Sequence, residues 1–257
     1  MIKFFRKIRQ RLLSENKFSK YLIYAIGEIV LVVIGILIAL SINEWNDKKK
    51  NNQSELIYYC RILEDFELDK QRIVELKDES DYRIDLSQKV LLELDGGTKD
   101  KNYIINQFIL ATRSEIYEPR NVTFKDLISS GNLKLLNDIS IKNSLIQYYS
   151  ELENKQSQLK QNRDEITKEV FELVNTSVEI GAIQEFEYVQ QLLNPEVLQI
   201  LSKEDWTKDK NSDFYKKLQQ VLLFNIAMAD RKKQHLTSIN NLMETSYQLL
   251  INKCEKQ

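Results

Sequence analysis

The balance of apolar and polar residues changes abruptly after residue 20. Residues 21–42, YLIYAIGEIVLVVIGILIALSI, form a run of 22 residues in which Glu28 is the single charge. A helix rises 1.5 Å per residue, so this run covers about 33 Å, close to the hydrocarbon thickness of a bilayer. The pattern predicts a membrane-spanning helix.

Insertion energies favour this interpretation. Fourteen of the 22 residues are Leu, Ile or Val, and together they contribute about −4 to −8 kcal/mol to insertion. An ionised Glu28 costs about 3 kcal/mol, so the apolar residues prevail. Tyr21, Tyr24 and Trp45 supply the aromatic belts that are typical of the two interfaces.

A cleavable signal peptide is the alternative interpretation, because Ala39-Leu40-Ser41 resembles a small-x-small cleavage site. The apolar run is longer than the usual 7–15 residues, however, and a further 20 residues precede it. We therefore expect an uncleaved anchor. A soluble core helix is disfavoured, since an apolar helix without a polar face needs protein on every side.

One face of the predicted span carries Glu28, Gly35 and Ala39. Small residues let helices approach closely, and a carboxyl group within a membrane usually faces a partner. This face is a candidate surface for self-association or for docking to another membrane protein. The alternative is that Glu28 merely extends toward the interface and that the small residues have no specific role.

Charges flanking the span predict its orientation. Seven Lys and Arg residues precede it, whereas Lys48, Lys49 and Lys50 follow it. The positive-inside rule places the N-terminus in the cytoplasm and the large C-terminal region outside the inner membrane, in the periplasm of a bacterium. The predicted order is a basic amphipathic tail (1–20), the transmembrane helix (21–42), a juxtamembrane linker (43–55) and a helical domain (56–257).

Two stretches resemble a known family. They are RKIRQRLLSENKFSKYLIYAIGEIVLVVIGILIALSINEWN, residues 6–46, and TFKDLISSGNLKLLND, residues 123–138, followed by Tyr148-Tyr149. Both are similar to signatures of a group of single-span membrane proteins of Bacteroidetes-type bacteria, classed as a domain of unknown function. The resemblance implies a membrane-anchored bacterial protein, and it brings no activity with it.

Helix-breaking residues are sparse after residue 50. Gly96-Gly97, Gly131 and Gly181 follow apolar-periodic segments, Pro119 lies in an extended stretch, and Asn194-Pro195 opens a short helix. Sustained strand alternation is absent from the sequence. The fold class is therefore predicted to be all-α.

Three long segments repeat apolar residues at alternating steps of three and four, which buries a narrow stripe against partner helices. Their apolar members are Leu56, Tyr59, Leu63, Phe66, Ile73, Leu145, Tyr149, Leu152, Leu159, Ile166, Val170, Leu173, Phe214, Leu218, Val221, Met228, Ile239, Leu242 and Leu249. Polar members interrupt these stripes, namely Lys70, Gln156, Arg163, Asn225, Lys232, His235 and Ser246. We expect an elongated antiparallel helical bundle with coiled-coil-like packing, with 98–137 and 182–210 as shorter helical connections.

A turn between two of the shorter segments is a candidate interaction site. Thr123 is expected to cap a short helix that Gly131 closes. The favoured interpretation of this region is a helix-turn-helix corner that packs its leucines. The alternative is a recognition surface formed by the turn residues Ser129, Ser130, Gly131 and Asn132.

Catalytic motifs are missing from the sequence. His235 is the single histidine, and no P-loop, dinucleotide-binding glycine pattern, nucleophile elbow or Cys-x-x-Cys occurs. Residues 51–257 hold 27 Lys and Arg against 34 Asp and Glu, which disfavours nucleic acid as a partner. We expect no cofactor, no metal and no enzymatic activity.

Cys60 and Cys254 are the two cysteines of the chain. In a bundle with an even number of long helices, both come to the same end, and an oxidising periplasm permits a disulfide between them. Free cysteines in separate places are the alternative, which the sequence alone favours. The expected function is a non-enzymatic, membrane-anchored interaction or scaffold module, and the alternative is the ligand-sensing subunit of a signalling system with a separate output partner.

Overall fold

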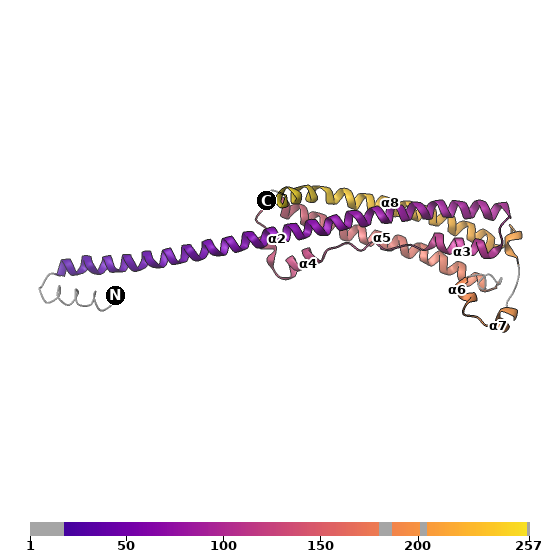
Figure 1. Cartoon of the computed structure of the whole chain (residues 1–257), viewed down its shortest axis with the longest axis horizontal. Helices are drawn as coiled ribbons and strands as arrows, with labels where there is room; N and C mark the ends of the chain where they lie inside the picture. Colours follow the sequence, from indigo (N-terminus) through magenta and orange to yellow (C-terminus); the bar gives the residue numbers. More distant parts are fainter. Residues whose placement is uncertain (1–17, 180–186, 201–204, 256–257) are drawn as a thin grey trace. The chain divides into compact units, whose positions relative to one another are not determined.

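The computed structural model in Figure 1 describes residues 18–179, 187–200 and 205–255. These residues form helices and connecting segments without a strand, which confirms the predicted all-α class. The chain divides into two compact units, Met1–Ile57 and Tyr58–Gln257. Gly181 and most of the predicted basic tail lie outside the described residues.

The first unit contains the start of helix α2 (Phe18–Gly96), which includes the whole apolar run. Leu, Ile and Val side chains of this run are exposed from Leu22 to Ile42, and Trp45 is exposed beyond them. Within the described chain, one helix is long and apolar enough to cross a membrane, and it is this one. Residues 43–55, the predicted linker, are helical and continue α2 without a break.

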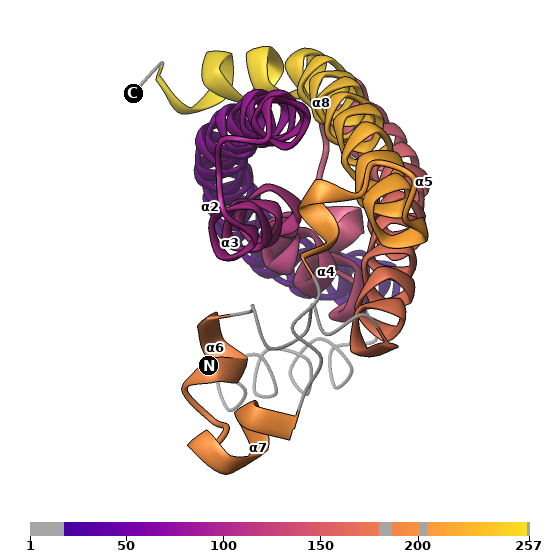
Figure 2. The same ribbon diagram turned by 90° about the vertical axis from the view of Figure 1, so that its right-hand side faces the viewer.

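The second unit is built on three long helical stretches, which are α2 from Tyr58 onward, α5 (Ile139–Glu179) and α8 (Asp213–Cys254). Figures 1 and 2 show them side by side. Asp138, which precedes α5, pairs with Lys253 at the end of α8 over 2.9 Å, and Glu169 late in α5 pairs with Lys217 early in α8 over 2.5 Å. These two helices are therefore antiparallel. Helices α2 and α8 are related in the same way, because Lys70 pairs with Glu244 over 2.8 Å and the Tyr215 hydroxyl donates to the Leu94 carbonyl over 3.4 Å. Because both are antiparallel to α8, α2 and α5 run parallel to each other.

Residues 97–138 return the chain from the end of α2 to the start of α5. They comprise α3 (Lys101–Thr112), a segment without helical structure at residues 113–121, α4 (Val122–Ser129) and the short 3-10 helix η1 (Asn132–Leu135). The expected helical connection is therefore interrupted. Pro119 has no amide hydrogen and disfavours the α conformation at the residue before it, which accounts for part of the break. We call residues 113–121 the extended segment.

Several predicted helix boundaries are confirmed. Gly97 and Gly131 adopt positive φ angles of 63° and 71° just after α2 and α4. Pro195 is the first residue of α7 (Pro195–Ile200), and the Asn194 side chain accepts a hydrogen bond of 2.9 Å from the amide of Val197. The short helices α6 (Glu187–Gln190) and η3 (Trp206–Lys208) complete the connection to α8.

The predicted cap at Thr123 is wrong. Helix α4 begins at Val122, two residues before the start at Phe124 that a cap at Thr123 implies, and Asn121 occupies the N-cap position without a side-chain hydrogen bond to the helix. Thr123 therefore lies inside the first turn. Phe124 and Leu127 are the buried residues of α4. Packing of these two side chains, rather than a side-chain cap, therefore stabilises this short helix.

The core of the second unit consists of two apolar clusters. The first joins residues 59–76 of α2 to α4, the start of α5 and the end of α8. The second joins residues 86–94 of α2 to α3, the later part of α5 and the start of α8. All apolar stripe residues predicted from the sequence are buried or half-buried, which confirms the stripes.

A polar layer separates the two clusters. Along each long helix, the residues of this layer lie between the residues of the first cluster and those of the second, or at the edge of one cluster. We define the polar layer as Glu79, Ser80, Arg83 and Ser87 of α2, Asn162 of α5, and Asn225 and Lys232 of α8. All except the half-buried Glu79 are buried, so each of these polar groups needs a partner inside the protein.

Asp69 of α2 holds the C-terminal end of the extended segment, at Tyr117 and Arg120. Its side chain is 1% exposed, and its two carboxylate oxygens accept hydrogen bonds of 3.0 and 3.1 Å from the amide of Arg120. The hydroxyl of Tyr117 donates to the same carboxylate over 3.4 Å. Burial raises the pKa of Asp69 from 3.8 to about 6, against the lowering effect of these hydrogen bonds.

This pKa predicts a pH-dependent stability. The folded state holds the Asp69 proton more tightly than the unfolded state, so the contribution of Asp69 to stability is greatest below pH 4 and decreases as the pH rises to about 6 and above. Relative to Asp69→Asn, the wild type should lose up to about 3 kcal/mol of unfolding free energy between pH 4 and 7. Chemical unfolding of both proteins across this range measures the difference.

Asp78→Asn removes an exposed carboxylate from the same helix and is the matched control. The prediction concerns the difference in unfolding free energy between the wild type and each variant. It is contradicted if this difference changes with pH no more for Asp69→Asn than for Asp78→Asn.

Candidate functional site

A cleft of about 480 Å³ opens beside the polar layer. Its lining comes from α2, the extended segment, α5 and α8. A helix with its side chains is about 10–12 Å across in every direction, whereas an extended chain takes about 10 Å in the direction of its side chains and only about 4.8 Å in the perpendicular direction. The extended segment therefore fills less space than a helix in the same position, and we attribute the cleft to this difference.

Arg83 and Lys232 form the inner end of the cleft. Their side chains are 3% and 6% exposed, and the carboxylate of Glu79, at 18%, lies 3.8 Å from Arg83 Nε and 2.7 Å from Lys232 Nζ. Burial lowers the pKa of both cations, and the charge of Glu79 opposes that shift. Two buried cations thus share one half-buried carboxylate.

Lys232 also holds the extended segment. Its ammonium group donates to the carbonyl of Glu115 over 2.9 Å and to the hydroxyl of Ser114 over 3.4 Å. The amide of Glu115 donates to Glu79 over 3.3 Å. The Glu115 carboxylate points to a different partner, Arg72, and is 60% exposed. It is therefore not a buried counterion for Lys232.

Asn225 ties α8 to α2 and to the end of α3. Its amide nitrogen donates to the carbonyl of Ala111 over 3.0 Å and to the hydroxyl of Ser87 over 2.9 Å. Its amide oxygen accepts from Arg83 Nη2, and Arg83 Nε donates to the Ala111 carbonyl over 2.9 Å. The Asn225 side chain is fully buried, so all of these bonds form away from water.

The remaining walls of the cleft are partly apolar. The apolar members are Ile116, Tyr117, Leu159, Ile166 and Met228. Lys160, Arg163 and Glu118 contribute charges at more exposed positions. Asn162 donates from Nδ2 to the carbonyl of Met228 over 2.9 Å, while its buried Oδ1 has no hydrogen-bond partner within the described chain.

A second, more open cleft lies between α2 and α8 and differs in its charge. Its charged lining residues are Lys77, Asp81, Asp230 and Lys233, and Lys233 is paired with Asp81. Its two cations and two carboxylates balance. The cleft beside the polar layer has four cations against two carboxylates in its lining.

The candidate association face of the first unit is open in the structure. Gly35 and Ala39 are exposed, and Glu28 is half-buried. A Cβ atom added at Gly35 meets no atom within 4 Å. The face therefore has the small profile that close helix approach requires. Its role in association stays a prediction.

The candidate interaction turn is exposed at three of its four positions. Ser129, Ser130 and Gly131 are exposed, whereas Asn132 donates a hydrogen bond of 3.1 Å to the Tyr58 hydroxyl. Leu127 and Leu136 on either side of the turn are buried, as expected for a packed corner. Recognition by this turn stays a prediction.

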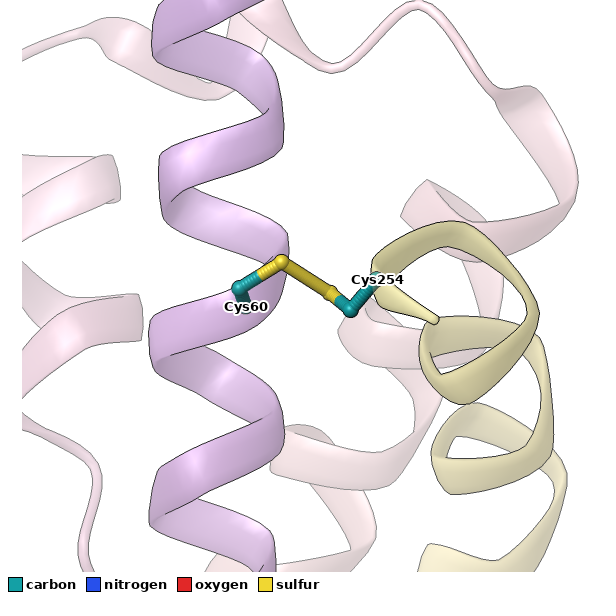
Figure 3. The surroundings of a disulfide bond; sticks show 2 residues. All are labelled: Cys60 and Cys254. Atoms are coloured by element: carbon teal, nitrogen blue, oxygen red, sulfur yellow. A yellow bond between two sulfur atoms is a disulfide. The ribbon is translucent and has the colours of Figure 1, made fainter. Parts of the chain in front are cut away.

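Cys60 and Cys254 are joined by a disulfide, with 5.7 Å between their Cα atoms. Figure 3 shows the bond between α2 and the last turn of α8. The sequence left two alternatives open, a disulfide or two free cysteines in separate places, and the structure contains the disulfide. Three long helices and the return through residues 97–138 make an even number of passages, so the two cysteines meet at one end.

His235, on the stripe of α8, is half-buried. Burial lowers its pKa, as do the nearby charges of Lys155 and Arg231. The described residues contain no group of three or more His, Cys, Asp and Glu side chains arranged to hold a metal ion.

The polar layer is the site that sequence reasoning missed. Asn225 and Lys232 appeared in the sequence as interruptions of an apolar stripe, seven residues apart and thus on one face of α8. That spacing was the available signal. Their partner Arg83 gave none, because a lone arginine in a helix rich in charges usually lies in solvent.

The network predicts a large effect for one substitution. Asn225→Ala leaves the Ser87 hydroxyl without this donor and removes an acceptor from Arg83, both of them buried. We expect the unfolding free energy to fall by about 2–4 kcal/mol. Asn241→Ala, at an exposed position of the same helix, is the control and should change it by less than about 0.5 kcal/mol. Equal effects of the two substitutions in chemical unfolding would show that the network does not stabilise the fold.

Comparison with known proteins identifies a family. A family described as "Family of unknown function (DUF6090)" matches residues 28–170, which is more than half of the chain. No curated protein and no solved structure matches the chain. The matched range runs from the apolar part of α2 through the extended segment to most of α5, and it agrees with the resemblance to a domain of unknown function. The chain is therefore a member of the DUF6090 family.

Proposed function

We propose that this chain is a non-enzymatic, membrane-anchored bacterial protein whose helical domain, residues 58–257, binds another protein or a second copy of itself. The observation that carries the proposal is the exposure of the apolar run of α2. No residue in the most apolar window of this helix is buried by the rest of the protein. Such a surface is stable in hydrocarbon and unfavourable in water.

The helical form of the run supports a bilayer as the partner. A helix satisfies its backbone hydrogen bonds internally, which is the condition for crossing hydrocarbon. Fourteen Leu, Ile and Val residues outweigh the cost of Glu28 by about 1–5 kcal/mol. We propose a single span at residues 21–42, in the inner membrane of a bacterium of the Bacteroidetes type.

Two independent features favour the periplasm for the helical domain. Seven cations before the span against three after it favour a cytoplasmic N-terminus. The Cys60–Cys254 disulfide favours an oxidising compartment for the other side, because such bonds are rare in the cytosol.

We infer that association uses two surfaces. In the membrane, the face with Glu28, Gly35 and Ala39 allows close approach of a second helix. In the helical domain, the turn Ser129–Asn132, which is exposed at its first three positions, offers hydroxyl and backbone groups that are held in place by Tyr58 and by the buried leucines beside it. Coiled-coil-like packing of the long helices is part of the same proposal, since it gives the domain a rigid frame.

The cleft beside the polar layer favours a second candidate function. A concave site with a few charged groups and apolar walls is typical of small-molecule binding. The chain would then be the ligand-sensing subunit of an envelope signalling system, and a separate partner would produce the output.

Membrane side is tested by protease added to spheroplasts that express the chain with a C-terminal tag. We expect the tag to be lost while a cytoplasmic marker protein survives.

On a non-reducing gel, we expect the wild type to migrate differently from Cys60→Ser, because the disulfide closes a loop across a sequence separation of 194 residues.

Protection of the tag until the membrane is lysed would place the domain in the cytoplasm and overturn the proposed topology. Identical gel mobility with and without reductant would show that the disulfide does not form in the cell.

Association through the membrane face is tested by crosslinking in native membranes. Gly35→Leu adds a large side chain to the small face and should weaken association by about 5- to 30-fold, which corresponds to about 1–2 kcal/mol. Glu28→Leu should act in the same direction. Gly27→Leu makes the same change about a quarter-turn away and should leave the crosslinked fraction unchanged. Equal crosslinking in all three variants and the wild type would exclude this face.

A further inference from the structure

We propose that the cleft beside the polar layer binds a small organic anion with an apolar body. The proposal goes beyond an anchored interaction module, because it names a ligand class for a specific site. Its volume of about 480 Å³ lies within the range of about 300–1,000 Å³ that is usual for small-molecule sites.

The charge at the inner end of the cleft is unbalanced. Arg83 and Lys232 are almost fully buried, and the half-buried carboxylate of Glu79 lies within ion-pair distance of both. The exposed Glu115 carboxylate acts on Lys232 only at longer range, because it pairs with Arg72, which also pairs with Glu75. Buried charges in proteins are normally paired, so the two buried cations lack a second counterion at ion-pair distance among the described residues. A ligand carboxylate, sulfonate or phosphate would supply it.

Hydrogen-bonding capacity at the site is also unused. Lys232 directs its donors to Glu79, Ser114 and the Glu115 carbonyl. Arg83 uses Nε and Nη2, while its Nη1 group makes no hydrogen bond to any described residue. Arg83 Nη1 is therefore the donor that we assign to the ligand anion, because a charge-assisted bond there is stronger than a neutral one. The unpartnered Oδ1 of Asn162 can accept from a hydroxyl or amide of the same ligand.

The walls determine the rest of the ligand. Ile116, Leu159 and Met228 present apolar surface to the cleft, and of these Leu159 and Met228 are half-buried whereas Ile116 is exposed. Tyr117 and Ile166 extend this surface. Lys160 and Arg163 at the rim add positive charge that would attract an anion from solution, whereas Glu118 opposes it. A purely polar anion would leave the apolar walls without contacts, so we assign an apolar or aromatic body to the ligand.

The charge preference is tested with a thiol at the cleft wall. Ser157 lines the cleft, and Ser238 lines the second, charge-balanced cleft. Full-length Ser157→Cys and Ser238→Cys proteins, purified in micelles with the native disulfide intact, react with an anionic reagent, 2-sulfonatoethyl methanethiosulfonate, and with its cationic trimethylammonium analogue. The rate of each reagent with the protein thiol is divided by the rate at which the same reagent reacts with free 2-mercaptoethanol in solution. We expect the anionic-to-cationic rate ratio at position 157 to exceed that at position 238 by about five- to tenfold. A ratio at 157 equal to or below that at 238 overturns the proposal.

Ligand binding is tested in the same proteins by protection. Sodium 3-phenylpropionate should slow labelling at position 157 and leave position 238 unchanged, and the neutral 3-phenylpropionamide should protect neither. Equal protection by the two compounds, or protection by neither, overturns the proposal. Neither experiment depends on the membrane side or on the association face, so failure here is distinguishable from failure of the anchored interaction module.

Discussion

The peptide groups of the extended segment impose the constraint on which the helical domain depends. A helix satisfies its own backbone hydrogen bonds, whereas an extended chain beside helices has no neighbouring strand to pair with. Here, side chains provide the partners for the amides of Arg120 and Glu115 and for the carbonyls of Glu115 and Ala111, the last of these at the end of α3. The side chains that bind them are Asp69, Glu79, Arg83, Asn225 and Lys232. A buried peptide group without a partner costs about 1–3 kcal/mol, so several such contacts decide whether the segment can stay in place.

The same constraint explains why the core is divided. Buried charges are usually less stabilising than well-packed apolar side chains of similar volume. Arg83 and Lys232 nevertheless occupy core positions, because they bind the carbonyls of Ala111, at the end of α3, and of Glu115, in the extended segment, which no apolar side chain could satisfy. The polar layer therefore interrupts the apolar core between its two clusters. The thin segment also leaves the cleft open beside this layer, so support for the backbone and the candidate ligand site have one origin.

Periodicity was sufficient to predict the long helices. The stripe residues recur at steps of three and four and are buried or half-buried as expected, and glycines at positions 97 and 131 take the left-handed conformation where helices end. Periodicity also marked Asn225 and Lys232 as exceptions on one face of α8. It could not show what they bind, because their partners on α2, on α3 and on the extended segment are 114 or more residues away in sequence and depend on how the chain returns. The cleft was unpredictable for the same reason, since it depends on the thickness of the returning segment.

The disulfide extends this argument to the end of the chain. Helix α8 supplies Lys232 to the extended segment and Asn225 to the end of α3, yet it is the last helix of the bundle and is the one whose end would fray most easily. Cys254 joins its last turn to Cys60 on α2, across a sequence separation of 194 residues. On the loop-entropy model, such a closure stabilises the fold by about 5 kcal/mol at most. By holding α8 against α2, the bond also keeps the donors of α8 close to the extended segment. The stability of the cleft is thus linked to the redox state of the compartment in which the domain folds.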